Sequence, residues 1–354
     1  MSSDLNNGMH SEPDDDMSDD ENETKPPVPY IKDWQFTVQQ HNPPPPTKPT
    51  SGDCTVEDIG ETNRLKQLQP IERCLKNPPA EGSYGPFSLD LRIHDTMRIG
   101  DKHHAQVVVV EVLTADPPVE GLSQGELVVA KIYDPLYVDN DDLYINPFVV
   151  ADKHYTHEDA AYKALSDLQG SVIPKYYGSY SLDVHIPIPI DLSTKRCVRL
   201  TLMELIPGSS MRNVDPHGLS QQTRQQIMKS LIELYTLAYS REIILVDTHP
   251  RNVMLTSSVS GHAPAVFIDF GDALFGWAWR WPRRLGSLPS TYVSPLLLFH
   301  EGHGRPREFQ DWIDWDWQPW LEAEFGHTAV SISPQVRDIF LPLKLVNGKL
   351  RPKN

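Results

Sequence analysis

The sequence predicts an α+β protein with two lobes, a small antiparallel β-sheet lobe followed by a mainly helical one. Short apolar runs bounded by turn residues dominate from residue 87 to residue 206. After that point helical periodicity takes over, and only brief strand-like runs remain between polar loops. The break falls at Pro207 and Gly208. The first lobe is therefore expected over residues 61–206 and the second over residues 207–354.

Residues 1–60 are expected to form a disordered acidic and proline-rich tail. Residues 1–25 carry nine acidic side chains against Lys25 alone. Prolines are frequent over the next stretch, including the run from Pro43 to Pro46. A segment of this composition buries too little apolar surface to offset the chain entropy that folding removes.

The first lobe is expected to contain five strands and one helix. The strand candidates are Phe87 to Ile99, Gln106 to Leu113, Leu127 to Tyr133, Val172 to Ser181 and Val198 to Ile206. The helix is expected over residues 156–168, because Tyr162 and Leu165 follow the spacing of one apolar face. Glu158 lies on that inward face, whereas Asp159 falls on a neighbouring, more exposed one.

The second lobe is expected to start with a long helix. Ser220 is a suitable N-cap, and apolar residues repeat at helical spacing to about residue 240. Three short strands are expected after it, at Ile243 to Val246, Val253 to Thr256 and Ala265 to Asp269. Seven of the eight tryptophans fall between residues 277 and 320, where they are expected to pack a short core, with Arg280, Arg283 and Arg284 as candidate charges for a substrate.

Charge and cysteine content exclude several classes of protein. The chain has 32 Lys and Arg against 48 Asp and Glu, a net charge of -16. Nucleic-acid and anionic-membrane binders use a basic surface, so neither partner is expected. The net charge does not exclude a local basic pocket for a phosphate. The three cysteines are odd in number and widely spaced, which favours an intracellular location in cytoplasm or nucleus. The longest aliphatic run, Val107 to Val110, is too short to cross a bilayer.

Three polar residues form the strongest chemical signal. Asp247 lies in a loop, Asn252 follows five residues later, and Asp269 ends the next expected pair of strands. Such groups can converge on a divalent cation and on a hydroxyl that attacks a phosphate. Asn252 and Asp269 supply the oxygen ligands that Mg²⁺ prefers, and Asp247 would orient or deprotonate the nucleophile. Each could also be a simple turn former, since Asp and Asn favour loops.

Lys131 is a candidate for contacting nucleotide phosphates. It lies in an apolar strand, after Val128, Val129 and Ala130. A lysine there neutralises phosphates when a carboxylate holds it, and Glu158 is the candidate holder. The alternatives are a surface lysine whose aliphatic stem is covered and an ordinary solvated glutamate.

At these residues the sequence resembles the protein kinase-like superfamily. The resemblance covers residues 87–275. Within this superfamily, the sequence is similar to the kinase-like proteins common in fungi. Its catalytic loop, Asp-x-His-Pro-x-Asn, is close to that of the small-molecule kinases for aminoglycosides and choline. The resemblance implies a bilobal kinase-like fold, shortened after Asp269-Phe270-Gly271, that binds ATP and Mg²⁺. It also implies that Met203, Glu204 and Leu205 form the entrance to an adenine pocket.

The sequence departs from that family at several places. Only Gly100 remains where a glycine-rich, phosphate-binding loop is expected. Leu245 and Val246 stand where protein kinases have His-Arg, and no Ala-Pro-Glu follows Gly271. These differences favour a substrate other than a protein, or no catalysis at all.

Two functions therefore stay open. The first is an ATP- and Mg²⁺-dependent kinase that transfers the γ-phosphate to a hydroxyl of a protein or small molecule. Its catalytic residues would be Asp247, Lys131 and Glu158, its nucleotide site Gly100, Lys131, Met203, Glu204 and Leu205, and its metal ligands Asn252 and Asp269. The second is a pseudokinase that binds nucleotide or partner proteins without catalysis.

Overall fold

The computed structural model describes most of the chain after residue 24. The described residues are 25–46, 64, 67–138, 146–186, 195–256, 264–276, 292–300, 306–340, 343–346 and 349–352. Several expectations lie outside them: disorder in residues 1–24 and 47–60, the tryptophans of residues 277–281, and the three arginines Arg280, Arg283 and Arg284.

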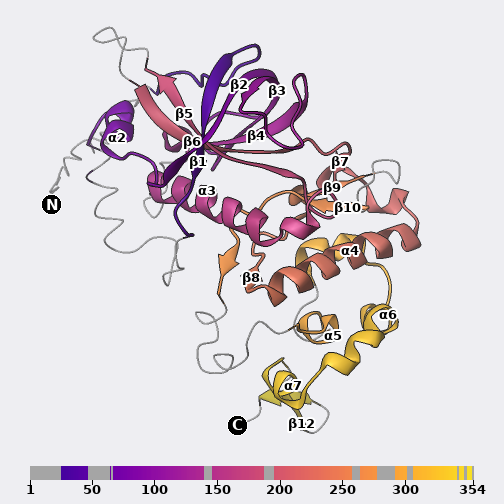
Figure 1. The fold of residues 1–354 in the computed structure, drawn as a ribbon. Coiled ribbons are helices and arrows are strands. Elements are labelled where there is room, and N and C mark those ends of the chain that lie inside the picture. Colours follow the sequence, from indigo (N-terminus) through magenta and orange to yellow (C-terminus); the bar gives the residue numbers. More distant parts are fainter. Residues whose placement is uncertain are drawn as a thin grey trace, which may run out of the picture.

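Six antiparallel strands close into a barrel (Figure 1). Around the barrel the order is β1-β2-β3-β4-β6-β5, and β1 pairs with β5 to complete the circle. The strands are β1 (Gln35–Asn42), β2 (Ser83–Arg98), β3 (Gln106–Asp116), β4 (Leu127–Tyr133), β5 (Tyr176–His185) and β6 (Lys195–Glu204). The five strands expected from the sequence correspond to β2 to β6.

Branched aliphatic side chains fill the barrel. Along β3, Val108, Val110 and Val112 alternate with less buried neighbours. This alternation is what a strand with one buried face requires. Leu89, Leu91, Ile93, Val128, Ala130, Leu200 and Leu202 complete the same core, each essentially inaccessible to solvent. The barrel therefore has its own hydrophobic core.

Strand β1 corrects the expectation that residues 1–60 are disordered throughout. Phe36 and Val38 are buried in the barrel core. The strand pairs with β2 on one side and with β5 on the other, with a register shift between Gln39 and His41. That shift interrupts the alternating pattern, and the neighbouring prolines conceal the short apolar run.

Helix α3 (Pro147–Ala164) lies below the barrel in Figure 1, between it and the rest of the chain. It begins nine residues before the expected start. Pro147 occupies its first turn, and the Asn146 side chain accepts hydrogen bonds from the backbone N–H of Phe148 and of Val149. Three smaller helices accompany it: α2 (Pro70–Lys76), η1 (Pro135–Tyr137) and η2 (Ser166–Leu168).

The C-terminal part, residues 207–354, mixes helices with short strands. The helix α4 (Gln221–Ser240) begins as expected at Ser220, whose Oγ accepts a hydrogen bond from Thr223 N at 3.1 Å. The other helices are η3 (Met211–Asn213), η4 (Pro216–Gly218), η5 (Pro250–Asn252), α5 (Pro295–Leu298), η8 (Arg307–Trp312), α6 (Trp317–Phe325), η9 (Gly326–Ser331) and α7 (Pro334–Phe340). The strands are β7 (Ser209–Ser210), β8 (Ile243–Ile244), β9 (Val253–Leu255), β10 (Ala265–Phe267), β11 (Leu274–Phe275), β12 (Leu343–Val346) and β13 (Lys349–Pro352).

The predicted fold class, a bilobal protein kinase-like fold with a mainly helical C-lobe, is wrong. The antiparallel sheet is not a small sheet but a closed six-stranded barrel, because β1 joins its two edges. The C-terminal part is not mainly helical, because small β-sheets and single-turn helices separate its longer helices in the described residues. The resemblance seen at single motifs therefore does not extend to the architecture.

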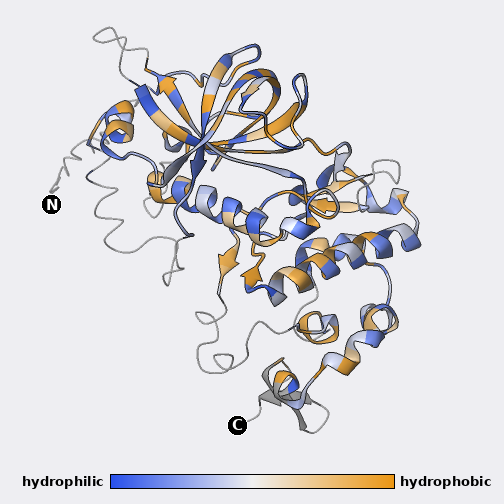
Figure 2. Ribbon diagram, viewed as in Figure 1, coloured by the Kyte–Doolittle hydropathy of each residue, from blue (hydrophilic) through white to orange (hydrophobic). Residues whose placement is uncertain are grey.

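A second hydrophobic core lies in the C-terminal part and reaches α3. Apolar residues of α4, coloured orange in Figure 2, pack with Phe267 and Phe270 and with Tyr162 of α3. Trp312 and Trp317 are buried in the same core, which confirms a packing role for these tryptophans. In the described residues no helix is both long and apolar enough to cross a membrane.

Candidate functional site

An apolar cavity of about 240 Å³ lies where the barrel meets the C-terminal part. Strands β2, β3, β4 and β6 contribute one wall and the segments around η5 and β10 the other. The lining residues are Met97, Arg98, Val107, Val129, Lys131, Pro174, Met203, Glu204, Leu205, Ile206, Arg251, Asn252, Met254, Ile268 and Asp269. Six residues predicted from the sequence are thus brought together on one surface: Lys131, Met203, Glu204, Leu205, Asn252 and Asp269.

Lys131 binds two carboxylates at the polar end of this apolar cavity. It lies in β4, where pairing with β3 and β6 fixes its backbone. The buried Nζ donates hydrogen bonds to Glu158 Oε2 of α3 and, at 2.9 Å, to Asp269 Oδ1. Tyr133 OH donates to the same Glu158 oxygen at 3.0 Å. The predicted Lys131–Glu158 pair is therefore present, and Lys131 is not a surface lysine.

Burial and pairing set the charges of this group. Burial raises the pKa of Glu158 to about 7, against the opposing effect of the Lys131 ammonium. Burial also opposes ionisation of Asp269, but Lys131 and a hydrogen bond from Gly271 N lower the pKa of that carboxyl to about 2. Asp269 is therefore ionised at neutral pH.

A hydrogen-bonded loop holds Asp247 and Asn252 together. Asn252 Nδ2 donates to Asp247 O at 3.0 Å and to Asp247 Oδ2 at 2.8 Å. The helix η5 turns the chain between them, and His249 Nδ1 accepts a hydrogen bond from Arg251 N at 3.2 Å. Asn252 O also accepts from Ile268 N, which joins the loop to the segment that carries Asp269. His249 thus shapes the loop, as a structural hydrogen-bonding residue would.

Arg251 is a site residue that sequence reasoning missed. Its Nη2 donates to both oxygens of Asp247, at 2.8 and 2.7 Å. It lines the apolar cavity as well as a neighbouring polar one. Its position four residues after Asp247 is the sequence feature that could have indicated a contact between the two. A lone arginine in a loop, however, usually has a solvated side chain.

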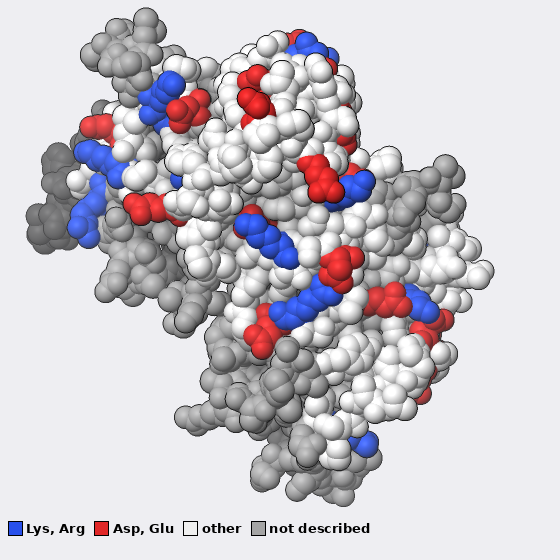
Figure 3. Space-filling model, in the orientation of Figure 1, with Lys and Arg blue, Asp and Glu red and all other residues white. Residues whose placement is uncertain are grey.

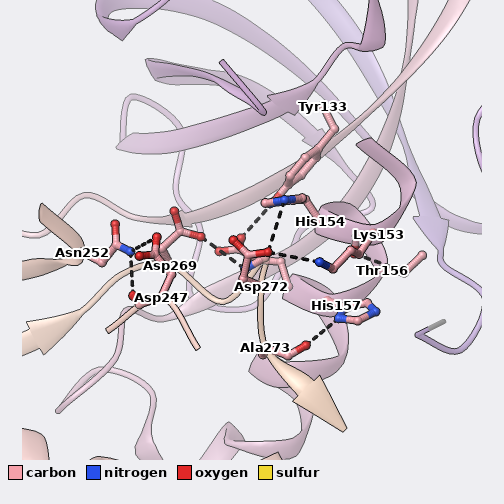
Figure 4. A network of polar contacts seen from close by, with 12 residues as sticks. Tyr133, Lys153, His154, Thr156, His157, Asp247, Asn252, Asp269, Asp272 and Ala273 are labelled. Carbon is pink, nitrogen blue, oxygen red and sulfur yellow. Dashed lines mark hydrogen bonds and ion pairs between the residues drawn. The ribbon is translucent and has the colours of Figure 1, made fainter. Parts of the chain in front are cut away.

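Helix α3 anchors the segment after Asp269 (Figure 4). Lys153 Nζ lies 3.3 Å and His154 Nε2 lies 3.6 Å from Asp272 Oδ1. His157 Nδ1 contacts the carbonyl oxygen of Ala273 at 2.5 Å. A side chain at position 271 would displace His154, because a Cβ there would lie 2.5 Å from His154 Nδ1. These contacts hold the backbone of the segment that follows Asp269 against α3.

Asn252 and Asp269 fit a magnesium ion in their donor chemistry. Asn252 Nδ2 donates both of its hydrogen bonds to Asp247. Asp269 accepts hydrogen bonds from Lys131 and from Gly271 N, both through Oδ1. Among the described residues no donor occupies Asn252 Oδ1 or Asp269 Oδ2, so each offers a hard oxygen ligand. No group of three or more His, Cys, Asp or Glu side chains suited to a metal occurs within the described ranges. A cation here would therefore need oxygens from its ligand or from water.

The end of β6 forms the edge of the apolar cavity. Pairing between β4 and β6 ends at Val128 and Glu204. Glu204 N donates to Lys175 O, and Glu204 Oε2 accepts from Lys175 N, both at 2.9 Å. The backbone of Leu205 and of Ile206 lies beyond this pairing, on the cavity wall. Sequence reasoning included Leu205 and missed Ile206.

Gly100 lines neither cavity, so its assignment to the nucleotide site is not supported by the geometry. It lies in the turn between β2 and β3 with a φ of 117°. Its backbone N donates to Gln106 Oε1 at 2.7 Å, and its carbonyl oxygen accepts from Gln106 Nε2 at 2.9 Å. The buried Gln106 side chain thus occupies the Gly100 N–H, the backbone donor that a phosphate would need.

Asp159 differs from its predicted environment. It is buried, as Glu158 is, and accepts hydrogen bonds from Tyr176 OH at 3.0 Å and Ser179 Oγ at 2.8 Å. Lys163 Nζ lies 2.7 Å from its other oxygen. Strand β5 covers this side of α3, which a helical pattern alone does not reveal.

Comparison with models of known protein families finds no match, and comparison with curated proteins finds no similar sequence.

Proposed function

We propose that the chain is an ATP- and Mg²⁺-dependent phosphotransferase that acts on a hydroxyl of a protein or small molecule. One observation carries the proposal: a buried lysine held by two carboxylates lines the same cavity as Asn252, which belongs to a hydrogen-bonded Asp–Asn loop. The proposal depends on this arrangement of Lys131, Asp247, Asn252 and Asp269, not on the fold.

The apolar cavity suits the adenine ring. Val129, Met203 and Ile268 offer apolar faces, and the backbone of Leu205 and Ile206 offers hydrogen-bonding groups at the edge. Lys131 lies at the polar end, where it would contact the phosphates. Asn252 and Asp269 would hold Mg²⁺, which neutralises charge on the β- and γ-phosphates.

Asp247 is proposed to act on the acceptor. The acceptor hydroxyl oxygen forms a bond to the γ-phosphorus while the bond from that phosphorus to the β–γ bridging oxygen breaks. The hydroxyl proton passes to the Asp247 carboxylate, and ADP leaves with the electron pair of the broken bond. Asn252 keeps the carboxylate directed, through its hydrogen bond to Oδ2.

A second candidate function is a pseudokinase that binds nucleotide or partner proteins without transfer. The observation that favours it is the pairing of Asp247 with Arg251, which occupies both carboxylate oxygens in this structure. Catalysis requires Arg251 to release Asp247, for instance when a phosphate group competes for the guanidinium. If Arg251 does not release Asp247, the protein would bind ATP without transferring the phosphate.

Thermal stabilisation and ADP release separate these candidates. Millimolar Mg-ATP should raise the melting temperature of the wild-type chain, because a ligand specific to the folded state stabilises it. Asp269→Asn should abolish that shift. Asp247→Asn should keep the shift and reduce ADP release by about a hundredfold or more, the usual range for loss of a catalytic base.

Asp183→Asn is the matched control, because the Asp183 side chain is exposed on β5 and lines neither cavity. It should behave like the wild type in both measurements. Stabilisation by ATP without ADP release, across a panel of hydroxyl compounds and proteins, would favour the pseudokinase. Absence of stabilisation by Mg-ATP would contradict nucleotide binding altogether.

Location and partners belong to the same proposal. The free thiols of Cys74 and Cys197 support an intracellular location of the protein, in cytoplasm or nucleus. On the face drawn in Figure 3, side chains of both charges lie in small mixed groups. The expected partners are ATP and a hydroxyl-bearing acceptor.

A further inference from the structure

A second, polar cavity of about 170 Å³ adjoins the apolar one. The two cavities share four lining residues, namely Arg98, Lys131, Arg251 and Asp269. The other residues of the polar cavity are Lys102, His103, His104, Ala105, Tyr133, His154, Asp247 and Asp272. A ligand whose apolar end fills the first cavity would therefore extend its other end into the second.

Cationic and imidazole side chains from one turn of the barrel line the polar cavity. Arg98 ends β2, and the turn that follows it supplies Lys102, His103 and His104. Three carboxylates also line this cavity, but each contacts another cation. Asp269 accepts from Lys131, Asp247 from Arg251, and Asp272 from Lys153. In a chain of net charge -16, this concentration of positive charge favours an anionic ligand.

The acidic residue of the same turn does not oppose this charge. Asp101 lines neither cavity and lies 3.0 Å from Lys25 Nζ, which neutralises it. Lys102 follows it in the left-handed region, with a φ of 68°. A lysine at such a φ is uncommon, and residues of this kind are concentrated at functional sites.

The backbone of the turn is not available to a ligand at Gly100. Gln106, which is fully buried, bonds both the amide and the carbonyl of that glycine. The turn is thereby fixed in one shape, and what it presents to the polar cavity is its side chains. Burial and the neighbouring Arg98 lower the pKa of His103, which favours the neutral imidazole of that residue.

We propose that Arg98 and Lys102, assisted by His103 and His104, bind the phosphate groups of the nucleotide. Side chains thus replace the backbone amides that a glycine-rich loop would provide. The inference rests on the proposed function, because it takes the adenine ring to fill the apolar cavity. It specifies a ligand with a polyphosphate chain, for which Lys131 and Arg251 supply further cations in the same cavity.

The double variant Arg98→Gln, Lys102→Gln tests this inference. Both side chains are exposed, so the variant should fold. The matched control is Lys32→Gln, Lys76→Gln, which removes the same charge from exposed positions outside the two cavities. Affinities for Mg-ATP, adenosine and inorganic tripolyphosphate would be measured by titration calorimetry at pH 7 and constant salt.

The expected result is a loss of at least tenfold in affinity for Mg-ATP and for tripolyphosphate in the Arg98, Lys102 variant. Adenosine affinity should change less than twofold, and the control should match the wild type. Unchanged Mg-ATP affinity in the variant would overturn the inference and leave the proposed function standing. If the wild type binds tripolyphosphate through these residues but neither ATP nor adenosine, the proposed function fails and the phosphate site stands. If the wild type binds none of the three probes, both fail.

Discussion

Lys131 lies between two carboxylates, Glu158 and Asp269, that differ in solvent exposure. This difference decides which of the two carboxylates can leave Lys131 to contact a ligand. Glu158 is wholly buried, and the barrel and α3 surround it. Asp269 retains 26% of its side-chain exposure and faces the cavities. Removing one member of a buried pair leaves an uncompensated charge, so the Lys131–Glu158 pair is expected to persist in every state. Asp269 is the member free to turn toward a cation or a phosphate-bound metal.

Asp152 is expected to make the free energy of unfolding depend on pH. It lies in α3, and its Oδ1 accepts a hydrogen bond from Ala80 N at 2.8 Å. Burial raises the pKa of this carboxyl to about 6. Because the folded state holds the proton more tightly than the unfolded one, the free energy of unfolding falls as the pH rises from about 4 to about 6.

Asp152→Asn should remove that dependence. The variant should gain about 1–3 kcal/mol relative to the wild type between pH 4 and pH 7, since one pKa unit corresponds to about 1.4 kcal/mol. Urea denaturation at several pH values would measure the difference. Asp95→Asn, at an exposed position of β2, should show no such trend. An offset between Asp152→Asn and wild type that stays constant with pH would contradict the assignment.

At the scale of elements, β1 decides whether the barrel is closed. Its Val38 is buried, with 1% of its surface exposed, and packs with residues of the neighbouring strands. Val38→Ala should lower the free energy of unfolding by about 2–3 kcal/mol, the usual effect of deleting buried methyl groups. Chemical denaturation would measure it.

Gln35→Ala is the control for β1, because Gln35 lies in the same strand but is exposed. Its effect should stay within about 0.5 kcal/mol. A neutral Val38→Ala would indicate that this segment does not pair in solution, as the composition of residues 1–60 first suggested.

The elements also show why sequence reasoning found some features and missed others. Strands β2 to β6 and helix α4 carry regular apolar periodicity, which is a local property of the chain. Strand β1 was missed because prolines surround it and a register shift interrupts its alternation. The start of α3 was missed because its first turns face several elements at once, so no single apolar stripe marks them.

The same distinction holds for the candidate site. Asp247, Asn252 and Asp269 were found because their spacing places them at loop and strand ends that meet. The role of Gln106 could not be inferred, since a glutamine in an apolar strand gives no sign that it binds the turn at Gly100. Arg251 and Lys102 were missed for a related reason: a charged residue in a loop is usually solvated, and only the tertiary arrangement turns it toward a cavity.

At the scale of the whole molecule, the cavities join two hydrophobic cores. The barrel core and the C-terminal core are separate clusters of buried residues, and α3 contributes Ala161 and Tyr162 to the second. The apolar cavity takes lining residues from both parts of the chain. A nucleotide bound there would therefore connect the two parts, and its effect should extend to both.

Hydrogen exchange would measure this connection. With Mg-ATP at 100 times its dissociation constant, amides that exchange only when the site opens should exchange up to about a hundredfold more slowly. We expect this protection in residues 98–106 and 203–206 of the barrel side and in residues 247–252 and 268–272 of the C-terminal part, because these segments line the cavities. Helix α6 lines neither cavity and should be unaffected. Adenosine should protect residues 203–206 with little effect on residues 98–106, since it lacks the phosphates that Arg98 and Lys102 are proposed to bind. Protection confined to one part of the chain would mean that the ligand does not join the two cores.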